Sequence, residues 1–264
     1  MKLENIKLVV TDMDGTLLNS KHELTPTFFE TYNKLKRNNI QFIAASGRQY
    51  YSIADKFESI LDEITIIAEN GAYIRKNGTE ILVKSIHIDL LKKVIEYTRT
   101  LPNIYIVLCG KSKAYIEQKE ENFVNFFKEF YNKYEIVDNL LDNLEDDYFK
   151  IALYNPYGAE ENIYPFFEKF SEELQIKISG EFWVDIMQLN VNKGTAINLI
   201  QNAHNISKDE TLVFGDYLND LEMFQNAGIS VAMKNAHPKI KEIASYITES
   251  NDEKGVEVFI NKLA

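Results

Sequence analysis

Two aspartates, one residue apart, follow a short apolar stretch near the N-terminus and constrain this chain more than any other feature. Ile6 to Val10 form a nearly continuous apolar run, typical of a strand buried on both faces of a sheet, and Asp12, Asp14 and Gly15 follow it. Residues i and i+2 of an extended chain point to the same side, so we expect the two carboxylates to project together. Like charges this close repel in a dry site, so a hard divalent cation is their expected partner. The alternative is a polar turn that binds nothing.

The composition limits the classes of partner. With 264 residues, 45% of them hydrophobic, the chain can form one large domain or two moderate ones around a real core. The net charge of −11 argues against nucleic acid and anionic membranes as partners, and a phosphate site would need a local cation. Cys109 is the single cysteine, which excludes an internal disulfide. We find no signal pattern and no apolar run near the roughly 18 residues of a membrane span, and we expect a cytoplasmic protein.

The first part of the chain alternates strands with helices. Further strands are expected at 40–45 and 64–68, the first ending in Ser46-Gly47-Arg48 and the second in Glu69-Asn70-Gly71. This alternation predicts right-handed crossovers and a parallel sheet. The pattern over 73–83 predicts a β-hairpin that leads away from that sheet.

The middle of the chain has paired strands and helices without this alternation. It predicts an α+β module, residues 84–187, inserted into a core domain made of residues 1–83 and 188–264. The elements expected in the module are helices at 89–100, from 122 onward and at 159–173, with strands at 104–109, 114–117, 148–154, 175–178 and 182–187.

Four phenylalanines of the module, Phe123, Phe126, Phe127 and Phe130, recur at helical spacing. A stripe of this kind is most often the face by which a helix packs on a core, and we predict that role here. The alternative is that the rings line a ligand pocket.

The last third of the chain returns to alternating strands and helices. Lys193-Gly194 opens a helix, and a strand over 211–214 ends in Gly215-Asp216, with Asn219 and Asp220 shortly after. In an open parallel sheet, ligands bind outside the carboxyl ends of the strands, so these groups should meet the polar ends of the first two strands. Several carboxylates with one lysine and one serine suit a phosphate bound with Mg²⁺.

On these residues the sequence resembles the haloacid dehalogenase superfamily, and within it the Cof-type phosphatases with a large inserted cap of type IIB. The four motifs of that superfamily occur in order, with the insertion between the second and the third: Asp12–Leu18, Ala45–Arg48, Lys193-Gly194 and Gly215–Asp220. Two further stretches match signatures of the subfamily: Glu69–Ala72 and Val231–Ala236. The resemblance covers essentially the whole chain. It implies a doubly wound, parallel-sheet, Rossmann-like α/β core with an inserted α+β cap.

The resemblance also implies a role for each motif residue. Asp12 would be the nucleophile that forms an aspartyl-phosphate, and Asp14 the acid and later the base. Mg²⁺ would be bound by the Asp12 carboxylate, the Asp14 carbonyl and the Asp216 carboxylate. The groups implied to hold the phosphoryl group are Ser46, Gly47, Lys193 and Asn219, with Asp220 behind them to orient Lys193 or a metal-bound water.

Taken alone, each of these residues has an ordinary structural explanation. Ser46-Gly47-Arg48 could be a strand-end turn, Lys193 a solvated residue of a first helical turn, and Asp220 a helix cap. Arg48 has two interpretations of equal weight, which are contact with substrate and pairing with a surface carboxylate. The presence of all four motifs in the right order argues against the view that all of these residues are ordinary turn and cap residues.

The sequence therefore predicts a Mg²⁺-dependent phosphatase of small phosphorylated metabolites, sugar phosphates or related organic phosphates. One alternative is a phosphomutase or phosphotransferase that uses the same intermediate. Another is a non-catalytic phosphate-binding regulatory protein, which the Asp12/Asp14 pair disfavours because binding alone needs no acid or base. We expect the inserted module to set specificity and to close over the substrate on hinges near 83–85 and 186–189.

Overall fold

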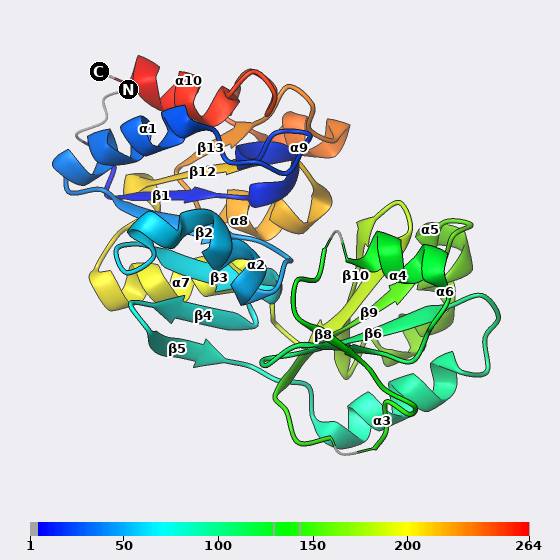
Figure 1. Cartoon of the computed structure of the whole chain (residues 1–264). Helices are drawn as coiled ribbons and strands as arrows, with labels where there is room; N and C mark the ends of the chain where they lie inside the picture. Colours follow the sequence, from blue (N-terminus) through cyan, green and yellow to red (C-terminus); the bar gives the residue numbers. More distant parts are fainter. Residues whose placement is uncertain (1–4, 129, 143, 264) are drawn as a thin grey trace.

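An eight-stranded and a six-stranded sheet, joined by two crossings of the chain, make up the architecture (Figure 1). The structure, a computed structural model, describes residues 5–128, 130–142 and 144–263. The larger sheet consists, in spatial order, of β14 (Tyr246–Ile247), β13 (Ile229–Ala232), β12 (Thr211–Gly215), β1 (Leu8–Thr11), β2 (Gln41–Ala45), β3 (Thr65–Ala68), β4 (Tyr73–Lys76) and β5 (Thr79–Val83). All strands of the smaller sheet come from the chain between β5 and residue 193, so this sheet is an insertion.

β1 lies at the centre of the larger sheet. Its four residues are buried, and Val10 lies opposite Ile43 of β2 on one side and Val213 of β12 on the other. The strands from β14 to β3 are parallel. From β1 the chain proceeds to β2 on one side and later returns to β12 on the other. The switch point of this sheet therefore lies at the carboxyl ends of β1 and β12, where open α/β sheets bind ligands.

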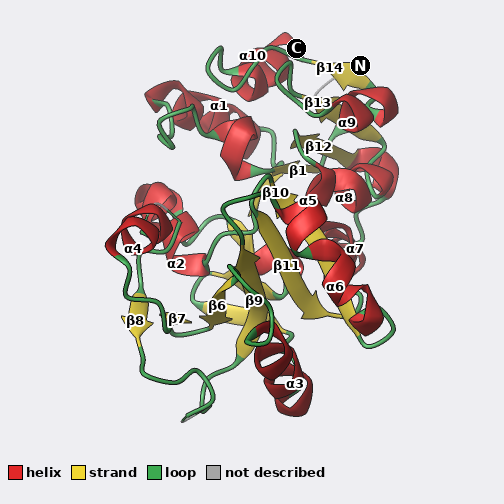
Figure 2. Ribbon diagram, turned by 90° about the vertical axis from the view of Figure 1, so that its right-hand side faces the viewer, coloured by secondary structure: helices red, strands yellow, loops and turns green. Residues whose placement is uncertain are grey.

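Helices cover both faces of the larger sheet, as Figure 2 shows. α1 (Pro26–Arg37) and α10 (Gly255–Lys262) lie together on one face, with α7 (Lys193–His204) and α8 (Leu221–Gln225) on the other. α2 (Tyr50–Ala54) follows β2, and α9 (Pro238–Ile243) connects β13 to β14. The predicted doubly wound α/β core is thus confirmed. Within the described ranges, no helix combines the length and the apolar character needed to cross a bilayer.

The smaller sheet consists, in spatial order, of β10 (Leu174–Gly180), β11 (Trp183–Gln188), β9 (Tyr148–Tyr154), β6 (Tyr105–Gly110), β7 (Ala114–Ile116) and β8 (Tyr134–Ile136). Its two faces carry different helices because the side chains of each strand alternate. Ile106 and Leu108 pack with α3 (Ile88–Thr98), α5 (Ala159–Asn162) and α6 (Tyr164–Phe167). Val107 and Cys109 pack with α4 (Glu121–Phe127). The module is α+β, as predicted.

The hairpin over 73–83 forms, but the prediction that it leads away from the sheet was wrong. β4 pairs antiparallel with β3, with Ile74 opposite Ile67, and β5 pairs with β4. The hairpin therefore extends the larger sheet by two strands. The physical reason is that β3 would otherwise leave the backbone groups of one edge without partners.

Two predicted boundaries of the module also differ. The helix expected over 159–173 is divided into α5, α6 and a short 3₁₀ turn, because Pro165 lacks the N–H that a continuous helix needs. β11 continues to Gln188, which pairs with Leu174, so the second crossing lies after residue 188 rather than at 186–189. The short strand β8 has no counterpart among the expected elements.

The phenylalanine stripe has two roles. Phe123 and Phe127 are buried in the core beneath α4, which confirms the predicted packing face. Phe126 and Phe130 are half-buried, with ring centroids 6.1 Å from that of Trp183. Phe130 also lines a cavity between the two sheets, so the alternative holds for this ring.

Replacing Phe127 by alanine tests the core of the module. Phe127 is fully buried and stacks on Tyr131, so Phe127→Ala should lower the free energy of unfolding by about 3–5 kcal/mol. The matched control is Phe166→Ala, because Phe166 is 44% exposed on α6 and its loss should cost less than about 1 kcal/mol. Equal effects of both substitutions in denaturant titrations would contradict this packing.

Candidate active site

The turn after β1 places Asp12 at the switch point of the larger sheet. The backbone N–H of Asp12 donates to the carbonyl of Phe214 in β12 at 3.0 Å. Residues 13–17 then form one wide turn, closed by the N–H of Leu18 donating to the carbonyl of Met13 at 2.8 Å. Gly15 is required here, because its φ is +74° and a Cβ would collide with the carboxylate of Asp216.

Lys193 joins two carboxylates at this point. It lies in the first turn of α7 with no exposed surface, and its Nζ donates to Asp12 Oδ1 and to Asp220 Oδ1, the latter at 2.7 Å. The other oxygen of Asp220 accepts from the N–H groups of Asp216 and Tyr217, at 2.9 and 3.2 Å. Burial lowers the pKa of Lys193, but the charges of Asp12 and Asp220 raise it by more than burial lowers it. The pKa therefore lies above its ordinary value, and Lys193 is an ammonium ion. Asp220 thus holds Lys193 against Asp12.

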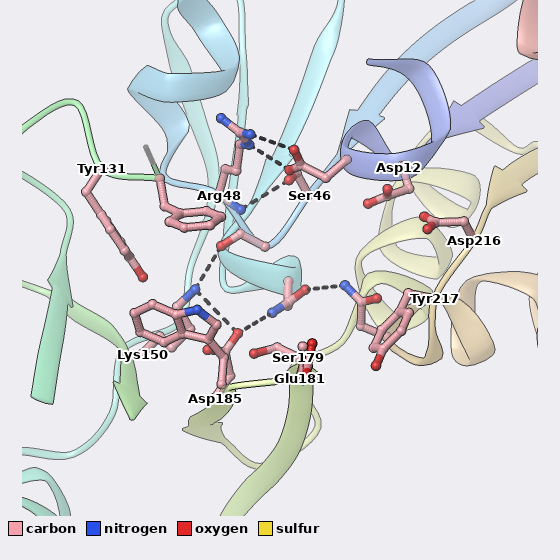
Figure 3. Close-up of a pocket in the computed structure, with 18 residues that line it drawn as sticks. Asp12, Ser46, Arg48, Tyr131, Lys150, Ser179, Glu181, Asp185, Asp216 and Tyr217 are labelled. Carbon is pink, nitrogen blue, oxygen red and sulfur yellow. Dashed lines mark hydrogen bonds and ion pairs between the residues drawn. The ribbon is translucent and has the colours of Figure 1, made fainter. Parts of the chain in front are cut away.

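A cluster of carboxylates remains around this lysine. Asp12, Asp216 and Asp220 each place one oxygen within 4.8 Å of the others (Figure 3 shows the first two). Thr16 Oγ1 donates to Asp216 Oδ1 at 2.9 Å. Burial, with the neighbouring carboxylates, raises the pKa of Asp12 well above its usual range and that of Asp216 to about 7. One lysine does not balance this negative charge, and hard oxygen donors in this arrangement fit Mg²⁺.

Asp14 points to a different cation. Its Oδ2 accepts from Arg48 Nε at 2.6 Å and its Oδ1 from Arg48 Nη2 at 2.5 Å, while His22 Nδ1 lies 3.0 Å from Oδ1. Burial alone raises the pKa of Asp14, but the hydrogen bonds from His22 and Arg48 bring it well below its usual range. Asp12 and Asp14 both line one cavity, as the expectation that they project together requires, but each carboxylate has its own basic partner. Arg48 is buried, whereas its partner Asp14 is 39% exposed, so Arg48 pairs with a partly exposed carboxylate of the site.

The loop after β2 faces the same cavity. Ser46 is buried, and its Oγ accepts from the N–H of Arg48 at 3.1 Å. A Cβ at Gly47 would lie 3.1 Å from the side-chain amide of Asn70, so glycine lets these two loops approach closely. Asn219 donates to Asn70 Oδ1 at 3.1 Å from the opposite side.

The cavity has a volume of about 580 Å³, which suits a small metabolite, and both sheets line it (Figure 3). The predicted site residues on its wall are Asp12, Asp14, Ser46, Gly47, Arg48, Asp216 and Asn219. Lys193 and Asp220 lie behind Asp12 rather than on the wall. The inserted module contributes Phe130, Tyr131, Lys150, Ser179, Gly180, Glu181, Trp183 and Asp185.

Sequence reasoning missed several polar residues of this site. Lys150 lies in the apolar strand β9 and Asp185 in the apolar strand β11, and both are buried. A single charge within a hydrophobic strand pattern is a signal that could have identified them, because such a charge requires a partner. His22 lies in an irregular loop, and we find no local pattern that would have identified it.

The Arg48–Asp14 pair predicts a pH-dependent stability. A carboxyl whose folded pKa lies below its ordinary value of 3.8 stabilises the fold above that pH, and the contribution disappears as the pH falls through the folded pKa. Asp14 is 39% exposed, so water replaces part of the pair, and Arg48→Met should cost about 1 kcal/mol at pH 7. The difference in the free energy of unfolding between wild type and Arg48→Met should be constant above about pH 5 and shrink below pH 4. The control is the same substitution in Asp14→Asn protein, where an equal pH dependence would contradict the assignment.

Comparisons with known proteins identify the family of this chain. Residues 9–260 match the family model of the haloacid dehalogenase-like hydrolases. The phosphatase YbjI of Escherichia coli, named for 5-amino-6-(5-phospho-D-ribitylamino)uracil, is 34% identical over 98% of this chain and 96% of its own. The phosphatase YwpJ of Bacillus subtilis is 27% identical over 95% of this chain and 97% of its own. The crystal structure of SMU.1108c from Streptococcus mutans, 30% identical, superimposes with a TM-score of 0.90 over 97% of this chain and 98% of that one. The chain therefore belongs to the haloacid dehalogenase-like hydrolases, as its motifs predict.

Proposed function

We propose that this enzyme is a Mg²⁺-dependent phosphatase that hydrolyses small phosphorylated metabolites through an aspartyl-phosphate. One observation carries the proposal: Asp12 is held by the buried ammonium of Lys193 beside the carboxylate of Asp216, on the wall of a cavity of metabolite size. A nucleophilic carboxylate needs a cation to hold it and space for a phosphate ester above it, and both are present. The phosphatase relatives described above support the same reaction.

In the first step, an oxygen of Asp12 attacks phosphorus, and the bond between phosphorus and the ester oxygen breaks. Lys193 donates to Asp12, which favours the ionised form of that carboxyl against the effect of burial, and it offsets negative charge as the phosphoryl group transfers. Ser46 and the N–H of Gly47 would hold the phosphoryl oxygens at the end of β2. Mg²⁺, held by the carboxylates of Asp12 and Asp216 and the carbonyl of Asp14, would supply positive charge that the lysine alone does not.

Asp14 would serve as the acid for the leaving oxygen and then as the base for water. Paired with Arg48 and His22, it is a carboxylate, which is the form that the second step requires. To act as the acid, its carboxyl must first leave Arg48 and take up a proton. Arg48 would therefore set when Asp14 is available, a role that adds to the carboxylate pairing considered from the sequence.

The charges around the cavity favour a substrate whose body, meaning the part other than the phosphoryl group, is uncharged. Five carboxylates and two cations line the cavity, and both cations already have carboxylate partners: Arg48 pairs with Asp14, and Lys150 with Glu69 and Asp185. Among the described lining residues, no free cation remains for a second anionic group. A phosphomutase that passes through a bisphosphate would need one, so this alternative has no support here.

The wall contributed by the module suggests the chemistry of that body. Trp183 and Phe130 offer aromatic faces, and Ser179 and Glu181 offer groups that can bond hydroxyls. A phosphorylated sugar or sugar alcohol, including one that carries a planar ring, fits such a wall. The name of the E. coli relative describes a molecule of this kind, a phosphorylated ribityl chain on a uracil. The cytoplasm, where metabolites of this class are handled, is the proposed location.

The inserted module would act as the specificity domain. It contributes the aromatic and hydroxyl-binding side chains, whereas the motif residues of the core can contact only the phosphoryl group common to all substrates. The proposed hinges are the two crossings of the chain, at 84–86 and 189–192, which lie outside both sheets. Closure on these hinges would exclude bulk water from the reaction.

A panel of phosphate esters tests the function. With Mg²⁺, glucitol 6-phosphate should be hydrolysed with a kcat/KM about tenfold or more above that of 6-phosphogluconate, because the added carboxylate meets a net negative wall. Both molecules are open chains, and they differ only in a hydroxymethyl group or a carboxylate at the end opposite the phosphate. An excess of chelator should abolish phosphate release. Phosphate release in excess chelator would contradict the Mg²⁺ dependence. A higher kcat/KM for 6-phosphogluconate would contradict the proposal that the substrate body is uncharged.

Two substitutions separate the nucleophile from the acid. Asp12→Asn should reduce hydrolysis to background with every substrate, because no covalent intermediate can form. Asp14→Asn should cost about tenfold with an aryl phosphate, whose leaving group needs little protonation, and about 10²–10⁴-fold with an alkyl phosphate. Circular dichroism serves as the folding control. Equal losses on both substrates for Asp14→Asn would refute the acid role.

A further inference from the structure

Lys150 is a buried cation of the inserted module that the mechanism above leaves unused. It lies in β9, is 3% exposed, and its ammonium reaches toward the larger sheet (Figure 3). Its Nζ donates to the carbonyl of Gly47 at 2.8 Å and lies 3.1 Å from Glu69 Oε2 and 3.4 Å from Asp185 Oδ2. An ammonium has three N–H donors, and these three oxygens match them in number.

The Ser46-Gly47-Arg48 loop shows what this lysine contributes to the core. The first carbonyl of the loop accepts from the N–H of Asn70 at 2.9 Å, and the third accepts from the N–H of Glu69 at 3.0 Å. The middle carbonyl accepts from Lys150. The core backbone therefore holds both ends of the loop, while its centre is held by a side chain of the inserted module.

A second series of hydrogen bonds connects the same module to the far side of the cavity. Asp185 accepts from Asn70 Nδ2 at 3.0 Å, and Asn70 Oδ1 accepts from Asn219 at 3.1 Å. Glu69, Asn70 and Gly71 have φ values of +50°, +54° and +105° in succession. Such a backbone persists where surrounding contacts hold it, and here the contacts come from both sheets.

We propose that Lys150 is a positioning residue that fixes the Ser46-Gly47 loop for phosphate transfer when the inserted module closes. This rests on the phosphatase function and on the module movement proposed above. If the module swings away, Lys150 leaves the Gly47 carbonyl, and Glu69 loses its cation. The loop is then complete only in the closed state, so phosphate transfer depends on closure over a substrate.

Direct binding of the substrate body by Lys150 is the competing role. The contacts argue against it, because its ammonium donates to the Gly47 carbonyl, lies within 3.4 Å of two carboxylates, and has almost no exposed surface. The two roles predict different kinetics. Loss of a lysine that positions the loop should slow the hydrolysis of every phosphate ester equally. Loss of a lysine that binds the substrate body should slow only the hydrolysis of substrates whose body reaches it.

The test compares Lys150→Met with Lys177→Met, using a small aryl phosphate and the best metabolite. Lys150→Met should lower kcat about 10- to 100-fold on both substrates, with the ratio of their kcat/KM values changed less than about threefold. Lys177→Met is the matched control, because it breaks another ion pair between module and core, Lys177–Glu222 at 2.5 Å, and leaves the loop alone. Its kcat should be unchanged. A loss confined to the metabolite would overturn the proposal in favour of direct binding.

Hydrogen exchange of the full-length chain gives a readout that does not require activity. The amides of residues 46–48 should exchange severalfold faster in Lys150→Met than in wild type or Lys177→Met protein. Because Lys150→Met leaves Glu69 buried without its cation, Lys150→Met/Glu69→Gln is the second variant, and it should behave in the same way. Unchanged exchange or unchanged kcat in these variants overturns the role of Lys150. An inactive wild type would refute the proposed function, while the exchange result would still decide whether Lys150 holds the loop.

Discussion

The ion pairs of one fully buried lysine hold the proposed site together. An ammonium removed from water costs several kcal/mol unless carboxylates surround it, and Lys193 has Asp12 and Asp220 as partners. These three side chains come from α7, from the end of β1 and from the segment after β12, which lie far apart in the sequence. The parallel sheet brings the three ends together at its switch point. The contact that stabilises the buried charge is therefore also the one that prepares the proposed nucleophile.

Paired charges also explain how a chain with a net charge of −11 can bind an anionic ester. In the part of the chain that the structure describes, the cations that line the cavity and Lys193 behind it all have carboxylates as partners, so none of them is free to attract anions without discrimination. Attraction for the phosphoryl group would then come from the proposed Mg²⁺ and from Lys193 together. The larger sheet would supply this chemistry. The inserted module supplies the aromatic and polar wall and, through Lys150, a hydrogen bond to the carbonyl of Gly47.

Much of the fold and of the site could be predicted, because both depend on local patterns. Apolar runs that end in polar residues located Asp12, Ser46 and Asp216 at the ends of strands, and the parallel topology implied that they meet. The errors arose where a strand or residue outside the local sequence pattern determines how a segment packs. The hairpin over 73–83 joined the larger sheet because β3 needed a partner at its edge, and Phe130 turned to the cavity because α4 ends at Phe127.

The sequence by itself determined the order of the elements, the four motifs and the residues that can carry the chemistry. Tertiary structure decided which charges meet. Asp12 and Asp14 are two residues apart and were expected to share one partner, yet Asp12 contacts Lys193 and Asp14 contacts Arg48. The contact of Lys150 with Gly47 joins residues of two different sheets. Local patterns report backbone conformation and burial, whereas such pairings depend on how the two sheets sit against each other, which no short stretch of sequence encodes.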